Sequence, residues 1–96
     1  MEIKLLVLVS GEQIISKVQD DETHYILEKP QKVVVDHSRF LTESSEDSEE
    51  RTLEVTLSPW VLLSSEKEFF VPKEKIVVVT TPIQTVVEMY KDKINE

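Results

Sequence analysis

Few side chains in the sequence have the types and spacing that a reaction or a metal ion needs. The chain has no cysteine, and its two histidines, His24 and His37, lie far apart, so the sequence contains no short spacing of metal ligands. No serine, histidine and acidic residue stand together as a triad, although triad residues meet in space and a small-barrel enzyme stays the minor alternative. We therefore expect a protein without catalytic residues, metal or cofactor.

Basic and aromatic residues are the next candidates, because they can hold phosphates and bases. Lys73 and Lys75 lie on a predicted turn where they could meet phosphate, and a solvated turn is the preferred interpretation. Trp60 could stack on a base, but packing is favoured for so large a side chain. Phe69 and Phe70 are adjacent in a predicted strand, so one is expected in the core and the other at a neighbour or a groove.

The charge of the chain is strongly negative and unevenly placed. The formal net charge is -8, which disfavours broad nucleic-acid binding. Many of the acids lie in residues 36–51, a serine-rich stretch that we expect to be a flexible acidic loop without the pattern of an EF-hand. No stretch approaches the roughly 20 apolar residues that cross a bilayer, and the lack of cysteine permits a reducing cytoplasm. A soluble cytoplasmic protein is expected.

The elements that position these residues are mostly strands of one domain spanning residues 1–96. Alternation of apolar residues predicts strands at 2–9, 14–19, 24–35, 52–60 and 76–79, with Gly11 in the first turn and Pro30 at an edge or a bend. Residues 61–70 fit either a bulge or two strands. A helix is predicted over 82–95, with Thr81 as N-cap and Gln84 completing a capping box.

Two short patterns carry a resemblance to a known family. In the first half, Gly11, Ile14, Ser16 and Val18 repeat a pattern of glycine, apolar, small and apolar residues. In the second half, apolar residues at 70, 71, 76 and 78 keep the family spacing, with Pro72 and Lys73 where the family has Arg-Gly. The chain resembles the Sm, LSm and Hfq proteins, and more narrowly the divergent Sm-like proteins of marine phages. The resemblance implies a mainly β fold, a small, strongly bent five-stranded barrel, here with a C-terminal helix.

The resemblance also implies a cyclic homo-oligomer. A β-branched final strand would be an apolar edge that invites pairing with another chain. In the Sm-like family, the last strand of each subunit pairs with the fourth strand of the next, which closes a ring. The expected interface residues are Leu53, Val55, Leu57, Ile76, Val77, Val78 and Val79.

Two functions follow from this resemblance and from the charge. Family analogy implies that the ring binds RNA or another single strand at its pore. The candidate binding residues in this chain are Asp21, His24, Lys73 and Lys75. The alternative is a scaffold or adaptor that presents its acidic loops or terminal helices to a protein partner. For either function we expect the protein in the cytoplasm, which would be the cytoplasm of the host if the chain is viral.

Overall fold

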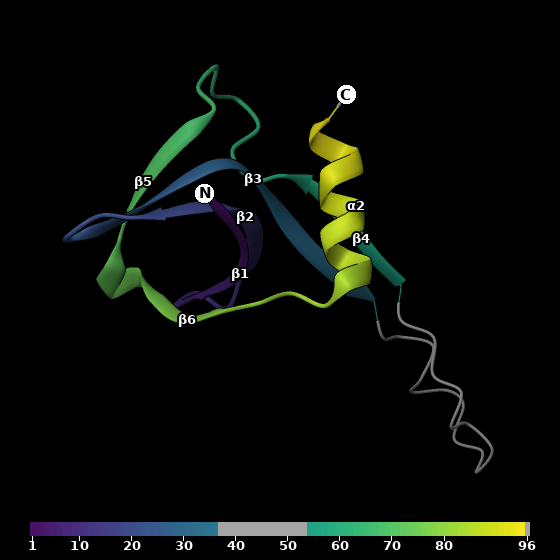
Figure 1. The fold of residues 1–96 in the computed structure, drawn as a ribbon, viewed down its shortest axis with the longest axis horizontal. Helices are drawn as coiled ribbons and strands as arrows, with labels where there is room; N and C mark the ends of the chain where they lie inside the picture. Colours follow the sequence, from purple (N-terminus) through teal and green to yellow (C-terminus); the bar gives the residue numbers. More distant parts are fainter. Residues whose placement is uncertain (37–53, 96) are drawn as a thin grey trace, which may run out of the picture.

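The computed structural model describes residues 1–36 and 54–95, and these form a bent antiparallel sheet with one α-helix beside it (Figure 1). In chain order the elements are β1 (Glu2–Leu8), β2 (Gln13–Asp20), β3 (His24–Asp36), β4 (Glu54–Pro59), β5 (Glu68–Pro72), the 3-10 helix η1 (Lys73–Lys75), β6 (Ile76–Thr80) and α2 (Gln84–Ile94). The sheet order is β4-β3-β2-β1-β6, and β5 also pairs with β3. The mainly β class predicted from the sequence is confirmed.

Sharp bends in β2 and β3 curve this sheet. The β2–β3 register shifts between Ile15 and Lys17, at Ser16, whose hydroxyl lies within hydrogen-bonding distance of the Lys17 and Glu28 carbonyls. On β3, Lys29 has a φ of 56°, and Pro30 follows without a backbone N–H. The expected bend at Pro30 is therefore present, and Ser16 is the small residue opposite it.

The fourth predicted strand is interrupted, so the described chain has six strands where five were expected. The second half of β3 pairs with β4, and its first half pairs with β5. Residues 60–67 leave the sheet between these two pairings, and the Lys29 N–H donates to the Lys67 carbonyl where they return. This resolves the ambiguous stretch 61–70 as a loop followed by a second strand.

The curved sheet has an apolar core on each of its two faces. Inside the curve lie Leu6, Leu8, Ile14, Val18, Leu27 and Val71, with Tyr25, Trp60 and Ile76 against them. The opposite face buries Ile15 and Leu57 against Tyr90 of α2, with Ile3, Leu5, Val33, Val86, Met89 and Ile94 around them. Neighbours such as Leu5 and Leu6 face opposite sides, as strand alternation requires. The helix therefore covers the outer apolar face of the sheet.

The helix begins later than the sequence predicted. Its N-cap is Ile83, whose side chain cannot accept a hydrogen bond, and the helix runs from Gln84 to Ile94. Thr81, the predicted N-cap, lies within 3.4 Å of the Lys4 ammonium group on β1 instead. The capping box is thus wrong, because Thr81 and Pro82 precede the N-cap, in the segment where the chain crosses from β6 to the outer face. The turn at Gly11, with a φ of 96°, is as predicted.

Candidate nucleic-acid and subunit interfaces

The turn between β2 and β3 and the 3-10 helix η1 meet at one end of the sheet. The Lys73 N–H donates to the Thr23 carbonyl at 3.1 Å, and the Lys73 ammonium group pairs with the Asp20 carboxylate at 2.5 Å. The same ammonium group lies 5.1 Å from the centre of the Tyr25 ring, within cation–π range. The hydrogen bond to Asp20 raises the pKa of Lys73 above its ordinary value, so this lysine stays charged.

Two more of the predicted site residues lie in this turn. The Asp21 N–H donates to the His24 carbonyl at 2.9 Å, which closes the turn, and the His24 ring shares a 2.7 Å hydrogen bond with the Thr23 hydroxyl. The structure therefore brings Asp21, His24 and Lys73 to one place. Lys75 lies at the far end of η1, and its carbonyl accepts from the Val9 N–H on the β1 side.

The charge of this turn cluster is more negative than positive. Its acids are Asp20, Asp21, Glu22 and Glu74, and its lysines are Lys73 and Lys75. Sequence reasoning missed Asp20 and Tyr25, which are the direct partners of Lys73. Tyr25 could have been found as the aromatic residue after His24, at the start of a strand where one face meets solvent. The cluster offers an aromatic face and a cation that is already paired.

Two strand edges without a partner in the described chain lie on either side of η1. β6 ends the sheet order, and β5 pairs only with β3. Phe70 on β5 is 63% exposed and Val77 on β6 is 62% exposed, while Phe69 turns inward against Trp60 with ring centroids 6.4 Å apart. Both edges thus present apolar side chains and free backbone groups.

The other predicted interface residues lie in different surroundings. Val78 and Val79 are exposed on β6, and Ile76 is half-buried against the inner core. On β4, Val55 is half-buried and Leu57 is buried under α2. A neighbouring subunit could therefore contact the backbone of Leu57 but not its side chain. Leu53 lies outside the described residues, as do His37 and most of the acidic loop at 36–51.

Within residues 1–36 and 54–95, no three histidine, cysteine or acidic side chains come together as metal ligands would. No helix in that part of the chain has the length and apolar character to span a membrane.

These features define a small, strongly bent antiparallel β-barrel with a loop cluster at one end and, within the described residues, edge strands at β4, β5 and β6. The family model described as Sm_like domain matches residues 3–91, and the chain belongs to this Sm-like family. The match covers the described strands and most of α2. None of the curated proteins compared with the chain matches it significantly.

Proposed function

We propose that the chain is a non-enzymatic ring subunit in which β5 of one copy pairs antiparallel with β6 of the next. The observation that carries this proposal is the presence of two apolar strand edges on one small domain, at Phe70 and at Val77 to Val79. An unprotected edge pairs readily with another chain. The two edges belong to different strands, so a contact between them is head-to-tail, and head-to-tail contacts can close into rings.

The mass in solution tests the ring. We expect a discrete mass that is a multiple of the 11.1 kDa chain, measured by light scattering or sedimentation. A single species at the mass of one chain would overturn the proposal.

A substitution on β6 tests which edge is used. Val78→Glu should dissociate the oligomer, because a charge would then face an apolar contact. Val34→Glu is the matched control, since Val34 is 45% exposed and Val78 is 42% exposed, and Val34 lies on an inner strand. An oligomer unchanged by Val78→Glu would place the contact elsewhere.

The proposal extends to single-stranded RNA at the turn cluster of each subunit. Tyr25 offers an aromatic face for a base, and Lys73 and Lys75 offer cations for phosphate. The surrounding acids make binding weak and dependent on low salt. Fluorescence anisotropy with short U-rich and A-rich RNAs at low salt tests this, and a flat titration with both would exclude it.

The charge of the chain favours a second function, a scaffold or adaptor for a protein partner. The net charge of -8 and the pairing of Lys73 with Asp20 both reduce the attraction for phosphate. In this alternative, the acidic loop at 36–51 or the terminal helices contact the partner. A pull-down that loses a partner when Thr42 to Glu50 are deleted would support it, and an unchanged set of partners would oppose it. A cytoplasmic setting and a phage source remain predictions.

A further inference from the structure

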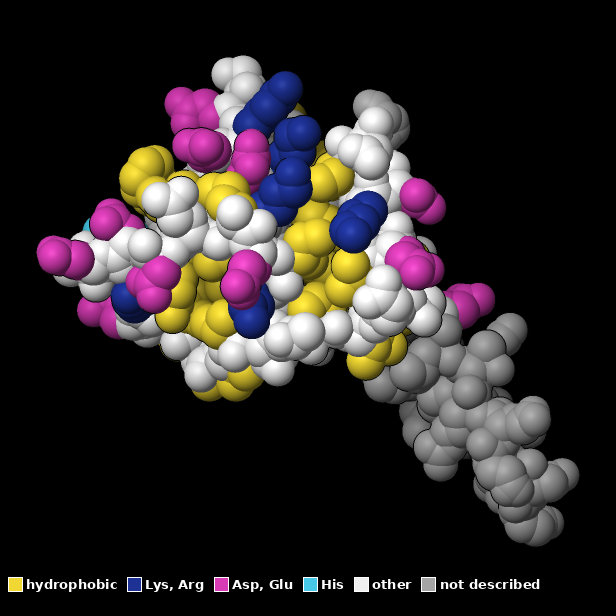
Figure 2. Space-filling model, in the orientation of Figure 1, with side chains coloured by type: hydrophobic (Ala, Val, Ile, Leu, Met, Phe, Trp, Pro, Cys, Tyr) yellow, Lys and Arg dark blue, Asp and Glu magenta, His cyan; other side chains and the backbone are white. Residues whose placement is uncertain are grey.

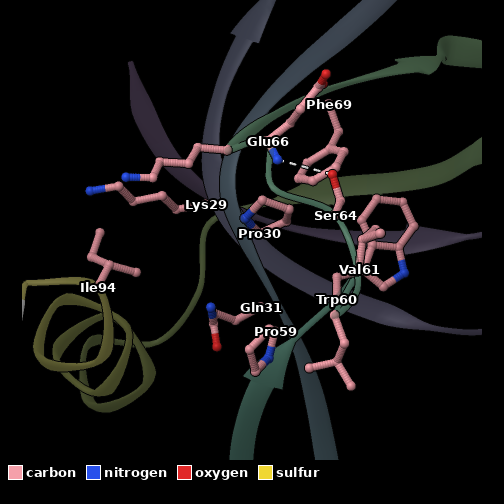
Figure 3. Close-up of a pocket in the computed structure, with 12 residues that line it drawn as sticks. Lys29, Pro30, Gln31, Pro59, Trp60, Val61, Ser64, Glu66, Phe69 and Ile94 are labelled. Atoms are coloured by element: carbon pink, nitrogen blue, oxygen red, sulfur yellow. Dashed lines mark hydrogen bonds between the residues drawn. The ribbon is translucent and has the colours of Figure 1, made fainter.

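The loop between β4 and β5 carries the two most exposed large apolar side chains of the described residues. Leu63 is 100% exposed and Leu62 is 71% exposed, and Val61 before them is 40% exposed. The Glu66 N–H donates to the Ser64 hydroxyl at 3.0 Å, which closes a turn directly after the leucines (Figure 3). Scattered apolar residues are normal at a surface, whereas three in a row indicate a contact with another molecule.

The paired strands of the proposed ring make only a small contact by themselves. β5 and β6 have five residues each, and a standard protein interface takes about 20–30 residues from each partner. Figure 2 shows apolar side chains at the border of the molecule where Figure 1 places β5 and β6. Each copy also carries a net charge of -8, so the copies repel one another. A stable ring therefore needs further apolar contact next to these strands.

The faces of the two strands restrict how they can pair. Phe70 lies between two residues that face inward, Phe69 and Val71, so its own side chain points to the outer face. Val78 pairs with Val7 of β1, which lies between two leucines of the inner core, so Val78 points outward too. An antiparallel pairing along all five residues puts Phe70 opposite Val78 of the next copy. A shift by one residue would set outward side chains opposite inward ones.

This pairing brings the loop beside the crossing from β6 to α2 of the next copy. In an antiparallel pair the start of one strand lies beside the end of the other, so Glu68 lies opposite Thr80. The loop comes directly before Glu68, and the crossing at 81–83 comes directly after Thr80. In this crossing, Ile83 is 69% exposed, more than any other described large apolar side chain outside the loop. Two exposed apolar surfaces thus meet next to the paired strands.

The loop and Ile83 of one copy lie at opposite ends of α2. Leu62 lines the same hollow as Ile94, which is in the last turn of the helix, and Figure 3 shows Ile94 across this hollow from the loop. Ile83 is the N-cap at the other end, and the eleven residues of α2 span about 16 Å. A contact between the two surfaces therefore joins two copies.

We propose that Leu62 and Leu63 of one copy pack against Ile83 of the next copy, as an apolar contact beside the β5–β6 pairing. The partner is a second copy of this chain, because both surfaces adjoin the proposed interface and the antiparallel direction brings them together. This inference rests on the ring proposed above and adds the contact that gives the ring its strength. An anionic membrane is disfavoured as the partner by the charge of -8.

A charge on the loop tests this contact without threatening the fold, because Leu63 is fully exposed. Leu63→Asp should raise the concentration at which the oligomer dissociates about tenfold or more, measured by sedimentation velocity. Ser65→Asp is the matched control, with the same charge at an exposed position of the same loop, and should keep the wild-type value. An oligomer equally stable in Leu63→Asp and the wild type would overturn the loop contact but not the ring. A wild type at the mass of one chain would overturn the ring and the loop contact together.

A charge at the other side of the contact should have the same effect. Ile83→Asp places a preferred capping residue at the N-cap of α2, so weaker association in this variant cannot come from a weaker helix. We expect the dissociation concentration to rise about tenfold or more, as for Leu63→Asp. Association unchanged in Ile83→Asp would show that the leucines pack elsewhere.

A covalent link identifies the partner of the loop directly. The chain has no cysteine, so introduced thiols have no competitors. A chain with both Leu63→Cys and Ile83→Cys should form a ladder of linked chains with a short bismaleimide, because each copy joins the next. A chain with Leu63→Cys and Val34→Cys is the control and should stay unlinked, since Val34 lies on the inner strand β3. An intact oligomer without linked chains in the first variant would overturn the proposal.

A lipid surface is the other occupant that these leucines could have. Co-sedimentation of the wild type, but not of Leu63→Asp, with phosphatidylcholine vesicles, at an unchanged oligomer mass, would assign the leucines to lipid and overturn the proposal. We expect no difference between the two proteins in this measurement.

Discussion

Tyr90 joins the helix to the bent part of the sheet through a single hydroxyl group. The side chain is fully buried, and its hydroxyl accepts from the Lys17 N–H at 3.1 Å. The same hydroxyl can donate to the carbonyls of Glu28 and Lys29, each at 3.0 Å. These backbone groups lie where the register of β2 and β3 shifts. Tyr90 therefore supplies hydrogen bonds to the backbone at the bend.

Removing the Tyr90 hydroxyl should lower the free energy of unfolding even if the aromatic ring keeps its place. Tyr90→Phe leaves the Lys17 N–H buried without an acceptor, so we expect a loss of about 1–3 kcal/mol in the free energy of unfolding. Urea unfolding measures it. Tyr25→Phe is the control, because Tyr25 is half-buried and its hydroxyl makes no described hydrogen bond. Equal losses in both variants would contradict this role.

The same residue predicts a pH dependence. Burial raises the pKa of the Tyr90 hydroxyl above its ordinary value, because the charged form would be desolvated; the hydrogen bond from Lys17 acts in the opposite direction. The raised pKa means that the fold favours the protonated hydroxyl. This contribution is complete below the pKa of the unfolded chain, about 10, and is lost as the pH rises through the folded value. The difference in unfolding free energy between the wild type and Tyr90→Phe should therefore shrink above about pH 10.

At the scale of elements, α2 completes the apolar core on the outer face of the sheet. Its apolar residues cover Ile15 and Leu57, which lie on the outer face of β2 and β4. Figure 1 shows the helix lying beside β3 and β4. Without the helix, that face of the sheet would meet water. The helix is thus a structural requirement of this barrel.

A charge on the packed side of α2 tests this conclusion. Val86→Asp should lower the free energy of unfolding by about 1–3 kcal/mol, because Val86 packs against the cluster around Tyr90. Thr85→Asp places the same charge one residue earlier on the exposed side of the helix, and should change stability by about 0.5 kcal/mol or less. Thermal or denaturant unfolding compares the two. Similar effects at both positions would show that the helix packs loosely.

At the scale of the whole molecule, the negative charge opposes the RNA binding that the family resemblance suggests. The chain carries a net charge of -8, and the ammonium group that could meet phosphate at the turn cluster is held by Asp20. A ring would repeat this arrangement in every subunit. Any RNA must therefore compete with an internal carboxylate for each Lys73.

This competition predicts that substitutions at Asp20 and at Lys73 change RNA affinity in opposite directions. Asp20→Asn should strengthen RNA binding severalfold at low salt, because it removes a negative charge and releases Lys73. Lys73→Gln should weaken it. Anisotropy titrations at two salt concentrations measure both, with Asp92→Asn as a control for net charge because Asp92 is exposed on α2, outside the cluster. Equal gains from Asp20→Asn and Asp92→Asn would show that total charge matters and the pair does not.

The local pattern of the sequence determined most of the strands. Alternation at Ile3 to Val9 and at Ile14 to Val18 predicts β1 and β2, because one face of each strand must be apolar. The β-branched run from Ile76 to Val79 predicts β6, and Gly11 predicts a turn that needs a positive φ. The resemblance to Sm-like proteins rested on the same short-range features, and the family match supports it.

The tertiary structure alone decided what depends on residues far apart in the chain. The interruption at 60–67, the pairing of Lys73 with Asp20 and the burial of Gln31 beside Ile94 join segments that no local pattern relates. The start of α2 also differs from the prediction: Thr81 lies near Lys4 on β1, and the N-cap is Ile83. Propensity acts within a few residues, whereas these contacts depend on how the bent sheet brings distant residues together. The sequence therefore determined the strands, and the curvature of the sheet decided its sites.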